Sequence, residues 1–321
     1  MNLRSNFGRA LLLVALAWVL SHALPAVAQP AQATLLRADV VAPGVWALVG
    51  PLSGPTRDNH ALNATYGVVA TAEGAILIDS GASAQGAQLL AVMAQQLTGK
   101  PVRWVINTGS QHHRWLGNDH LHKAGAQLIA HQRTVQSQRA GAAAQMVELQ
   151  SLLGDRLDGT RAAYAERLLD GARSVWSLGG TRIEMLDLGD AHFPGDVVVL
   201  LPAAGVAFTG DLVYVERLLS FAPASNPRSW LATFERFTAL SPAHVVPGHG
   251  GPTNIATAQA QTGAYLRYVV NGVARHAKEM AGVQAALAEL GDAPAFAQLA
   301  NFAQLHRSNV SRAYLRAEAE Q

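Results

Sequence analysis

The sequence predicts a layered α/β fold in which two β-rich halves each carry their own helices. Half of the 321 residues are apolar and 14% are charged, which is enough apolar material to form a large core. The 29 glycines and 14 prolines are spread along the chain, as in a protein of many short elements joined by turns. Apolar runs with strand character recur in both halves and alternate with helical stretches. We therefore expect one compact domain, or one domain with a small appendage.

The expected strands are short apolar runs bounded by glycine, proline or polar turn residues. They lie at residues 45–49, 66–70, 75–78, 102–106 and 127–130, from 182 onward, and at 197–201, 206–209 and 244–246. The expected helices have apolar residues at helical spacing, and the second is rich in alanine and glutamine. They lie at residues 84–97, 134–153 and 228–240, and from about 256 to the end.

The first 28 residues have the layout of a cleavable secretory signal. Arg4 and Arg9 precede an apolar run over about residues 10–20, and residues 26–28 form an Ala-Val-Ala cleavage site. The run is shorter than the roughly 20 apolar residues of a spanning helix, so stable membrane insertion is not expected. We predict a periplasmic or secreted protein whose mature chain begins at Gln29.

Charge and cysteine content exclude two further possibilities. The signal contains two of the 24 basic residues, so the mature chain has 22 basic and 22 acidic residues. This neutral balance gives no reason to expect a nucleic-acid partner. The chain has no cysteine, so it forms no disulfide and offers no thiolate to a metal.

Polar segments lie at the ends of several expected strands, where α/β folds place their functional sites, and the loop 189–196 comes just before the strand 197–201. They are Asp79-Ser80-Gly81, the loop 107–118 with His112 and His113, the loop 189–196 with His192, Gly210-Asp211 and Gly248-His249.

Taken in order, these five segments resemble the pattern of the metallo-β-lactamase superfamily. That pattern is Asp-x-Gly after an early strand, His-x-His-x-Asp-His, a lone His, Gly-Asp and a final Gly-His. The resemblance covers about residues 40–268, and the features Tyr265-Leu266 and His306-Arg307-Ser308-Asn309-Val310 resemble exported, SoxH-like members. It implies a four-layer αββα sandwich over residues 29–270, with a C-terminal helical extension over residues 271–321.

The second motif departs from the superfamily pattern. A gapless alignment places Gly109, Gln111, His113 and Arg114 at the four His, His, Asp and His positions. Only His113 is a good zinc ligand, because glycine has no side chain, glutamine offers a neutral amide and arginine is a permanent cation. A guanidinium about 5 Å from a dication would cost on the order of 6–7 kcal/mol at an effective dielectric of ~20. We therefore expect one zinc ion at most, or none if Arg114 pairs with an aspartate instead.

The remaining positions are intact. The resemblance implies that His113, His192, Asp211 and His249 converge on one pocket as the metal ligands, with Arg114 beside them. Asp211 or His113 would orient an attacking water, so Asp211, His113 and Arg114 are the expected catalytic residues. Arg114 and Asp211 could instead form a bidentate ion pair in a metal-free ligand pocket.

Other polar residues have simpler interpretations. We expect Asp79 to hold the strand-end turns together by hydrogen bonds, and His112 to be a surface residue unless the loop alignment shifts by one position. His120 and His122 are expected to be solvated residues near a helix start. Tyr214 is expected at the pocket mouth. Separately, Trp115 and Leu116 are expected to pack the loop onto the core.

Three hypotheses for function remain. The first is an exported mononuclear metallohydrolase that cleaves an ester, thioester, lactone or lactam. The second is an inactive periplasmic protein of the same fold that binds a small-molecule ligand. The third is an accessory role in sulfur or redox metabolism, which the absence of cysteine disfavours. The sequence does not define an oligomeric state.

Overall fold

Two β-sheets form the centre of the fold. The computed structural model describes residues 35–321, so the expected signal peptide of residues 1–28 lies outside the described residues. Within this part of the chain the first sheet has the strand order β1-β2-β3-β4-β5-β6-β7, and the second has the order β12-β11-β10-β9-β8. The first sheet consists of β1 (Arg37–Ala42), β2 (Val45–Val49), β3 (Thr65–Ala70), β4 (Ala75–Ile78), β5 (Val102–Asn107), β6 (Gln127–His131) and β7 (Arg167–Leu169). The second consists of β8 (Arg173–Leu178), β9 (Thr181–Leu186), β10 (Val198–Leu201), β11 (Val206–Phe208) and β12 (His244–Val246).

The helices lie between and after these strands. They are α1 (Ala84–Thr98), α2 (His112–Trp115), α3 (Asn118–Lys123), α4 (Gln132–Leu153), α5 (Pro227–Thr238), α6 (Ile255–Ala258), α7 (Ala264–Lys278), α8 (Val283–Leu290) and α9 (Phe302–Ala319). Local signals set their ends. For example, Ser83 Oγ accepts the Gly86 N–H at the start of α1, and Gly99 ends the helix in the left-handed conformation with φ 70°.

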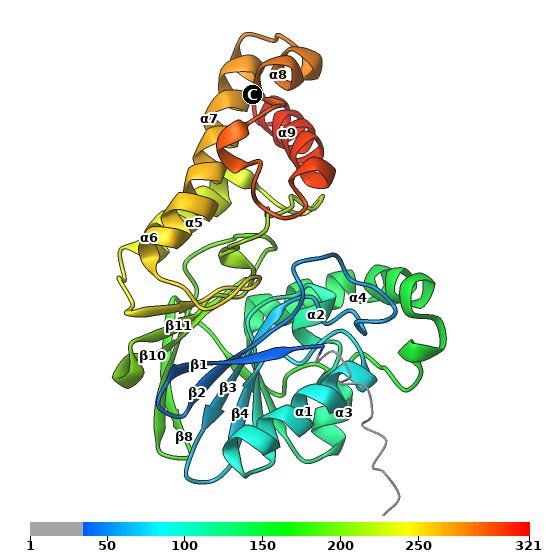
Figure 1. Ribbon diagram of the computed structural model, residues 1–321, viewed down its shortest axis with the longest axis vertical. Coiled ribbons are helices and arrows are strands. Elements are labelled where there is room, and N and C mark those ends of the chain that lie inside the picture. Colours follow the sequence, from blue (N-terminus) through cyan, green and yellow to red (C-terminus); the bar gives the residue numbers. More distant parts are fainter. Residues whose placement is uncertain (1–34) are drawn as a thin grey trace, which may run out of the picture. The chain divides into compact units, whose positions relative to one another are not determined.

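Alternation along the strands divides the core into layers. Ile76 of β4 and Phe208 of β11 point into the apolar cluster between the two sheets. Leu77 points to the opposite face, where it packs with residues of α1. Ala207 likewise packs with Phe234 of α5 on the outer face of the second sheet. The expected αββα sandwich is therefore confirmed, and Figure 1 shows α1 and α3 beside the first sheet.

The sheets approach each other closely at one glycine. A Cβ atom on Gly67 would lie 2.2 Å from Cε1 of Phe208, far inside van der Waals contact. Only glycine at this position lets the Phe208 ring lie flat against the backbone of β3.

Most expected elements agree with the structure to within a few residues, but four differences are informative. The strands β1, β7 and β8 were not expected, and the segment expected as a loop at His112 forms the short helix α2. β1 and β8 lie at the edges of their sheets, and their side chains are mostly exposed or half-buried, so they lack the apolar runs of the central strands.

The helical C-terminal segment begins at α6 and continues through one π-helical turn, Gln259–Gly263, into α7. Its buried face includes a polar network in which the Tyr265 hydroxyl contacts His306 Nδ1 at 3.0 Å and accepts from Asn309 Nδ2 at 3.0 Å. α7 runs across residue 270, and residues 35–321 form one compact unit. A separate extension from residue 271 therefore stays a prediction. Among residues 35–321, no helix is both long and apolar enough to cross a membrane.

Candidate metal centre

The site lies where strands of both sheets end. In the first sheet, β4 is followed by Asp79, and β5 is followed by the loop that leads into α2. In the second sheet, β11 is followed by the 3-10 turn Gly210–Leu212, and β12 is followed by the segment that contains His249. β4 pairs with β5 in parallel, and β11 pairs with β12 in parallel. Because the carboxyl ends of parallel neighbours lie at the same edge of a sheet, these segments meet although they are far apart in sequence.

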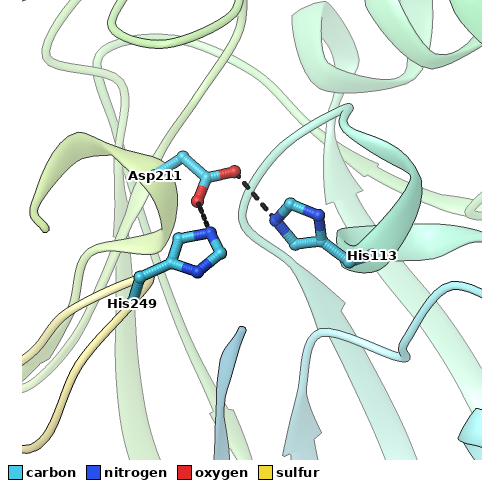
Figure 2. A group of neighbouring side chains, drawn as sticks. All are labelled: His113, Asp211 and His249. Atoms are coloured by element: carbon cyan, nitrogen blue, oxygen red, sulfur yellow. Dashed lines mark hydrogen bonds and ion pairs between the residues drawn. The ribbon is translucent and has the colours of Figure 1, made fainter. Parts of the chain in front are cut away.

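Three side chains converge at this edge: His113, Asp211 and His249 (Figure 2). His113 Nε2 lies 3.2 Å from Asp211 Oδ2, and His249 Nε2 lies 3.3 Å from Asp211 Oδ1. One ligand atom from each residue lies within 4.8 Å of the other two, which is a spacing that could hold a metal ion. All three residues are buried, so water competes little for their ligand atoms.

Arg114 lies under Asp211 with its guanidinium fully enclosed. Nε and Nη2 donate to the two carboxylate oxygens of Asp211 at 3.2 and 2.6 Å. Nη1 donates to Asp79 Oδ2 at 2.9 Å and to the Thr65 carbonyl at 3.1 Å, and Nη2 also donates to the Gly248 carbonyl at 2.9 Å. All five N–H groups are therefore used, and the bidentate pair expected between Arg114 and Asp211 is confirmed.

Asp79 has the structural role expected for it. Its carboxylate accepts the backbone N–H and the hydroxyl of Thr108, both at 2.7 Å, in addition to Arg114. Burial raises the pKa of Asp79 to about 6, although Arg114 and the Thr108 hydrogen bonds favour its ionised form. Asp79 thus joins two strand ends and balances part of the Arg114 charge.

The ionisation states of the central residues follow from burial and from Arg114. Burial opposes ionisation of Asp211, but the Arg114 guanidinium and then His113 hold the pKa of that carboxyl well below its usual range. Burial lowers the pKa of His113 to about 3 and the pKa of His249 to about 4. At neutral pH the site therefore contains one carboxylate and two neutral imidazoles, which is a zinc-binding set of groups.

The tautomer of His249 is set by its second nitrogen. Nδ1 lies 2.8 Å from the carbonyl oxygen of Asn63, which can only accept, so the proton of the neutral ring is on Nδ1. Nε2 then presents a lone pair to Asp211 Oδ1 at 3.3 Å. Two acceptors face each other at this point, and a cation between them would make the arrangement favourable. A backbone carbonyl that orients a metal-binding histidine is a usual feature of such sites.

His192 does not join the group of three. Its Nδ1 lies 3.2 Å from Ser225 Oγ, and Ser225 in turn donates to the His192 carbonyl at 2.7 Å. The ring packs against Phe193 and Trp230. His192 is not among the residues that line the cavity next to His113 and His249, and it is not part of the group of three. Its Nε2 is buried without a partner, so a role for His192 in metal binding stays a prediction.

The altered loop has lost the space for an imidazole as well as the imidazole itself. A Cβ on Gly109 would lie 2.7 Å from Oδ1 of Asp196. Burial, and then the charge of Asp211, raise the pKa of Asp196 well above its usual range. Gln111, at the second altered position, has a buried Oε1 without a partner among the described residues. Neither altered position therefore offers an imidazole for a second metal.

Two of the three central residues, His113 and His249, face a cavity of about 370 Å³. His113, His249 and Tyr214 line it, as expected for Tyr214. His112 also lines it and is only 4% exposed, so its expected place on the surface is wrong. The first turn of α2 buries this ring against that of His113, with centroids 5.1 Å apart. His120 and His122 lie on α3, where His122 is exposed as expected.

Comparisons with known proteins agree with this geometry. Residues 159–249 match the family model described as "Metallo-beta-lactamase superfamily". The chain is therefore similar to this superfamily over those residues. The match contains His192, Asp211 and His249 and leaves out the altered loop.

Solved structures share the metallo-β-lactamase fold with this protein. A metallo-beta-lactamase from Pontibacter korlensis has a TM-score of 0.58 and 20% identity, over 72% of this chain and 99% of that chain. The DIM-1 metallo-beta-lactamase has a TM-score of 0.57 and 19% identity, over 72% and 97%. A metallo beta lactamase from Hirschia baltica has a TM-score of 0.55 and 18% identity, over 72% and 97%. A search of curated proteins found no match.

Two residues of the site were not expected from the sequence. The backbone carbonyl of Asn63 orients His249, so the identity of the side chain at position 63 could not reveal this role in the sequence. Arg217 lines the cavity next to His249, with Nη1 3.3 Å from Nδ1. The only indication of this role in the sequence is that Arg217 lies six residues after Asp211. That spacing points to the site only when the fold of the segment after Asp211 is known.

Proposed function

We propose that this protein is a metal-dependent hydrolase that binds a single zinc ion through His113, Asp211 and His249. The observation that carries the proposal is the contact between the His249 Nε2 lone pair and the ionised Asp211 carboxylate. An arrangement of two facing acceptors is unfavourable in a buried site and becomes favourable when a cation lies between them. Metallo-β-lactamase superfamily proteins are generally zinc-binding hydrolases, which supports the same conclusion.

The three residues fit zinc in both chemistry and number. Zinc prefers imidazole nitrogen and carboxylate oxygen when no thiolate is present, and three protein ligands leave a fourth position open. When bound, zinc would acidify a water molecule and polarise the carbonyl of an ester, thioester, lactone or lactam.

The chain itself contributes orientation and charge balance. Arg114 fixes both oxygens of Asp211, and Asn63 fixes the ring of His249, so the ligands need little rearrangement to bind an ion. Asp211, as an ionised acceptor beside His113 and His249, can also orient the attacking water. Arg114 cannot turn away from the site, but Asp79 and Asp211 together offset its positive charge. A first dication therefore meets less repulsion than an unpaired guanidinium would cause.

A second zinc ion is not expected. Gly109 provides no ligand, Gln111 provides only an amide, and Arg114 occupies the position of a further histidine. His112 and His192 each have a buried ring nitrogen without a partner among the described residues, but neither is part of the group of three. Two neutral imidazoles are too few protein ligands for a second tightly bound structural or catalytic zinc.

The test is the zinc content of purified protein. Protein dialysed against a chelator and then loaded with zinc should retain close to one ion per chain, measured by elemental analysis after gel filtration. His113→Ala and His249→Ala should each lose it, whereas His244→Ala, a change at an exposed histidine of β12, should not. If the wild type retains no zinc, the Arg114–Asp211 pair marks a metal-free ligand pocket and the hydrolase proposal fails. Retention of two ions would show that the altered loop has been misinterpreted.

We also propose that the protein acts outside the cytoplasm, in the periplasm or as a secreted protein. The support is the layout of residues 1–28, with two arginines, an apolar run and an Ala-Val-Ala site.

A further inference from the structure

The helix α4 buries polar side chains on one of its faces. Gln138 is fully buried and Gln145 is 8% exposed, although glutamine is usually a surface residue. Thr134, four residues before Gln138, is also fully buried, and these spacings of four and seven residues place all three side chains on one side of the helix. A buried amide is costly unless it forms hydrogen bonds, so the partners of this face indicate its role.

The two glutamines bind the backbone of the altered loop between β5 and α2. Gln138 Nε2 donates to the Gly109 carbonyl at 3.1 Å, and Gln145 Nε2 donates to the Ser110 carbonyl at 2.8 Å. Trp115 Nε1 donates to the same Ser110 carbonyl at 3.0 Å and to Gln145 Oε1 at 3.1 Å. Two consecutive loop carbonyls are therefore held by α4 just before the chain enters α2.

The anchored loop leads directly to His113. α2 begins at His112, two residues after Ser110, and has only four residues. The side chain of Gln111, its N-cap residue, makes no hydrogen bond to the helix, and so short a helix has little stability of its own. Trp115 at the end of α2 belongs to the same hydrogen-bonded network as the loop. The network with α4 thus constrains both ends of the helix that contains His113.

The same face of α4 also holds a second loop of the site. The Thr134 hydroxyl donates to the Gly195 carbonyl, in the loop between β9 and β10. A Cβ on Gly195 would lie 2.6 Å from the backbone carbon of Arg133, so the loop lies directly against the start of the helix. One helix face therefore fixes the backbone of two site loops. A metal could not anchor the altered loop in this way at Gly109, which has no side chain to bind it.

We propose that Gln138 and Gln145 are positioning residues, which place His113 for metal binding by holding the altered loop in shape before any metal is bound. Without either amide, a buried loop carbonyl loses its donor, and the loop gains conformations that direct His113 away from Asp211. Zinc would then have to order the loop as it binds, which lowers its affinity. The inference rests on the proposed function for the role of His113 as a ligand, but the order of the metal-free loop does not depend on that function.

The test compares Gln138→Met and Gln145→Met with two control variants on the same helix. Methionine has a similar length but cannot donate a hydrogen bond. Gln150→Met is the exposed control, because among the described residues the Gln150 amide donates only to the Gly154 carbonyl at the end of α4. Val135→Ala is the destabilising control. Val135 is 4% exposed and packs in the apolar cluster beside α1, so its loss weakens packing without removing a loop contact.

Hydrogen exchange of metal-free protein reports the order of the loop without zinc. The peptide 107–116 is followed by mass spectrometry in all five proteins. We expect it to exchange about tenfold faster in both glutamine variants than in wild type, the ratio for one lost buried hydrogen bond. In the Gln150 control its rate should equal that of the wild type. In the Val135 control it should change no more than the rates of other peptides from the first sheet.

Zinc affinity, measured by competition with a chromophoric chelator, reports the placement of His113. The Kd should rise about tenfold in Gln138→Met and Gln145→Met and stay within about twofold of wild type in both controls. The proposal is overturned if the loop exchanges equally in wild type and glutamine variants, or if zinc binds them equally well. It is also overturned if Val135→Ala weakens zinc binding as much as they do. If no protein binds zinc but the loop still depends on both amides, the hydrolase proposal fails and the role of α4 in ordering the loop stands.

Discussion

Replacing Arg114 with methionine tests whether this residue holds the site together. Methionine keeps a long flexible stem but removes five hydrogen bonds and leaves Asp79 and Asp211 buried without a counter-charge. Removing one partner of a buried ion pair typically costs about 3–5 kcal/mol. For a domain of this size that corresponds to a fall in melting temperature of roughly 10 °C. The measurement is urea unfolding of metal-free protein at pH 7, with Arg103→Met as the exposed control expected to change stability by under about 0.5 kcal/mol.

A second substitution separates charge from packing in this experiment. In the Arg114→Met background, Asp79→Asn removes one of the two unpaired carboxylates, so it should recover part of the lost stability. In the wild-type background the same Asp79→Asn change should destabilise, because it breaks the 2.9 Å contact with Arg114. If Arg114→Met unfolds within about 1 kcal/mol of wild type, the guanidinium does not organise this site and the argument from its five contacts is refuted.

Further predictions concern the altered loop, acid sensitivity and export. Gly109→Ala should destabilise by roughly 1–3 kcal/mol in urea unfolding and be rescued by Asp196→Ala, since the two side chains compete for one space; a Gly109→Ala variant as stable as the wild type would count against this. The free energy of unfolding of metal-free protein should be greatest above about pH 6.5 and should fall as the pH drops towards 4. The reason is that four buried imidazoles have lowered pKa values in the folded state and take up protons when the protein unfolds. A free energy of unfolding that does not change with pH would contradict this. These imidazoles belong to His112, His113, His192 and His249. Protein from a periplasmic fraction should begin at Gln29 by N-terminal sequencing, and an intact Met1 would disprove cleavage.

The central strands and the site loops could be predicted from the sequence because their signals are local. The run Ala75–Ile78 is apolar on both faces and ends in an aspartate turn, so its burial and its position at the site follow from its composition. The edge strands could not be found in the same way. Val175 in β8 is 46% exposed, and the strand's outer face needs no apolar residue.

The sequence predicted which backbone segments form the site, but not the direction of every side chain in it. The order of motifs gave the correct segments, and His113, Asp211 and His249 do meet. The direction of the His192 ring depends on Ser225 and Trp230, which lie more than thirty residues further along the chain. Arg217 becomes a site residue through pairing of its neighbours with Ala300, a contact that no local pattern encodes.

The bridge between Arg217 and Ala300 also has a consequence for the order of events in the cell. The cavity wall is built from segments as distant as Gly54 and Leu305, and Leu305 lies in α9. A chain emerging from a ribosome therefore cannot complete this cavity until α9 has been made. Ligand capture is thereby confined to chains in which α9 has docked.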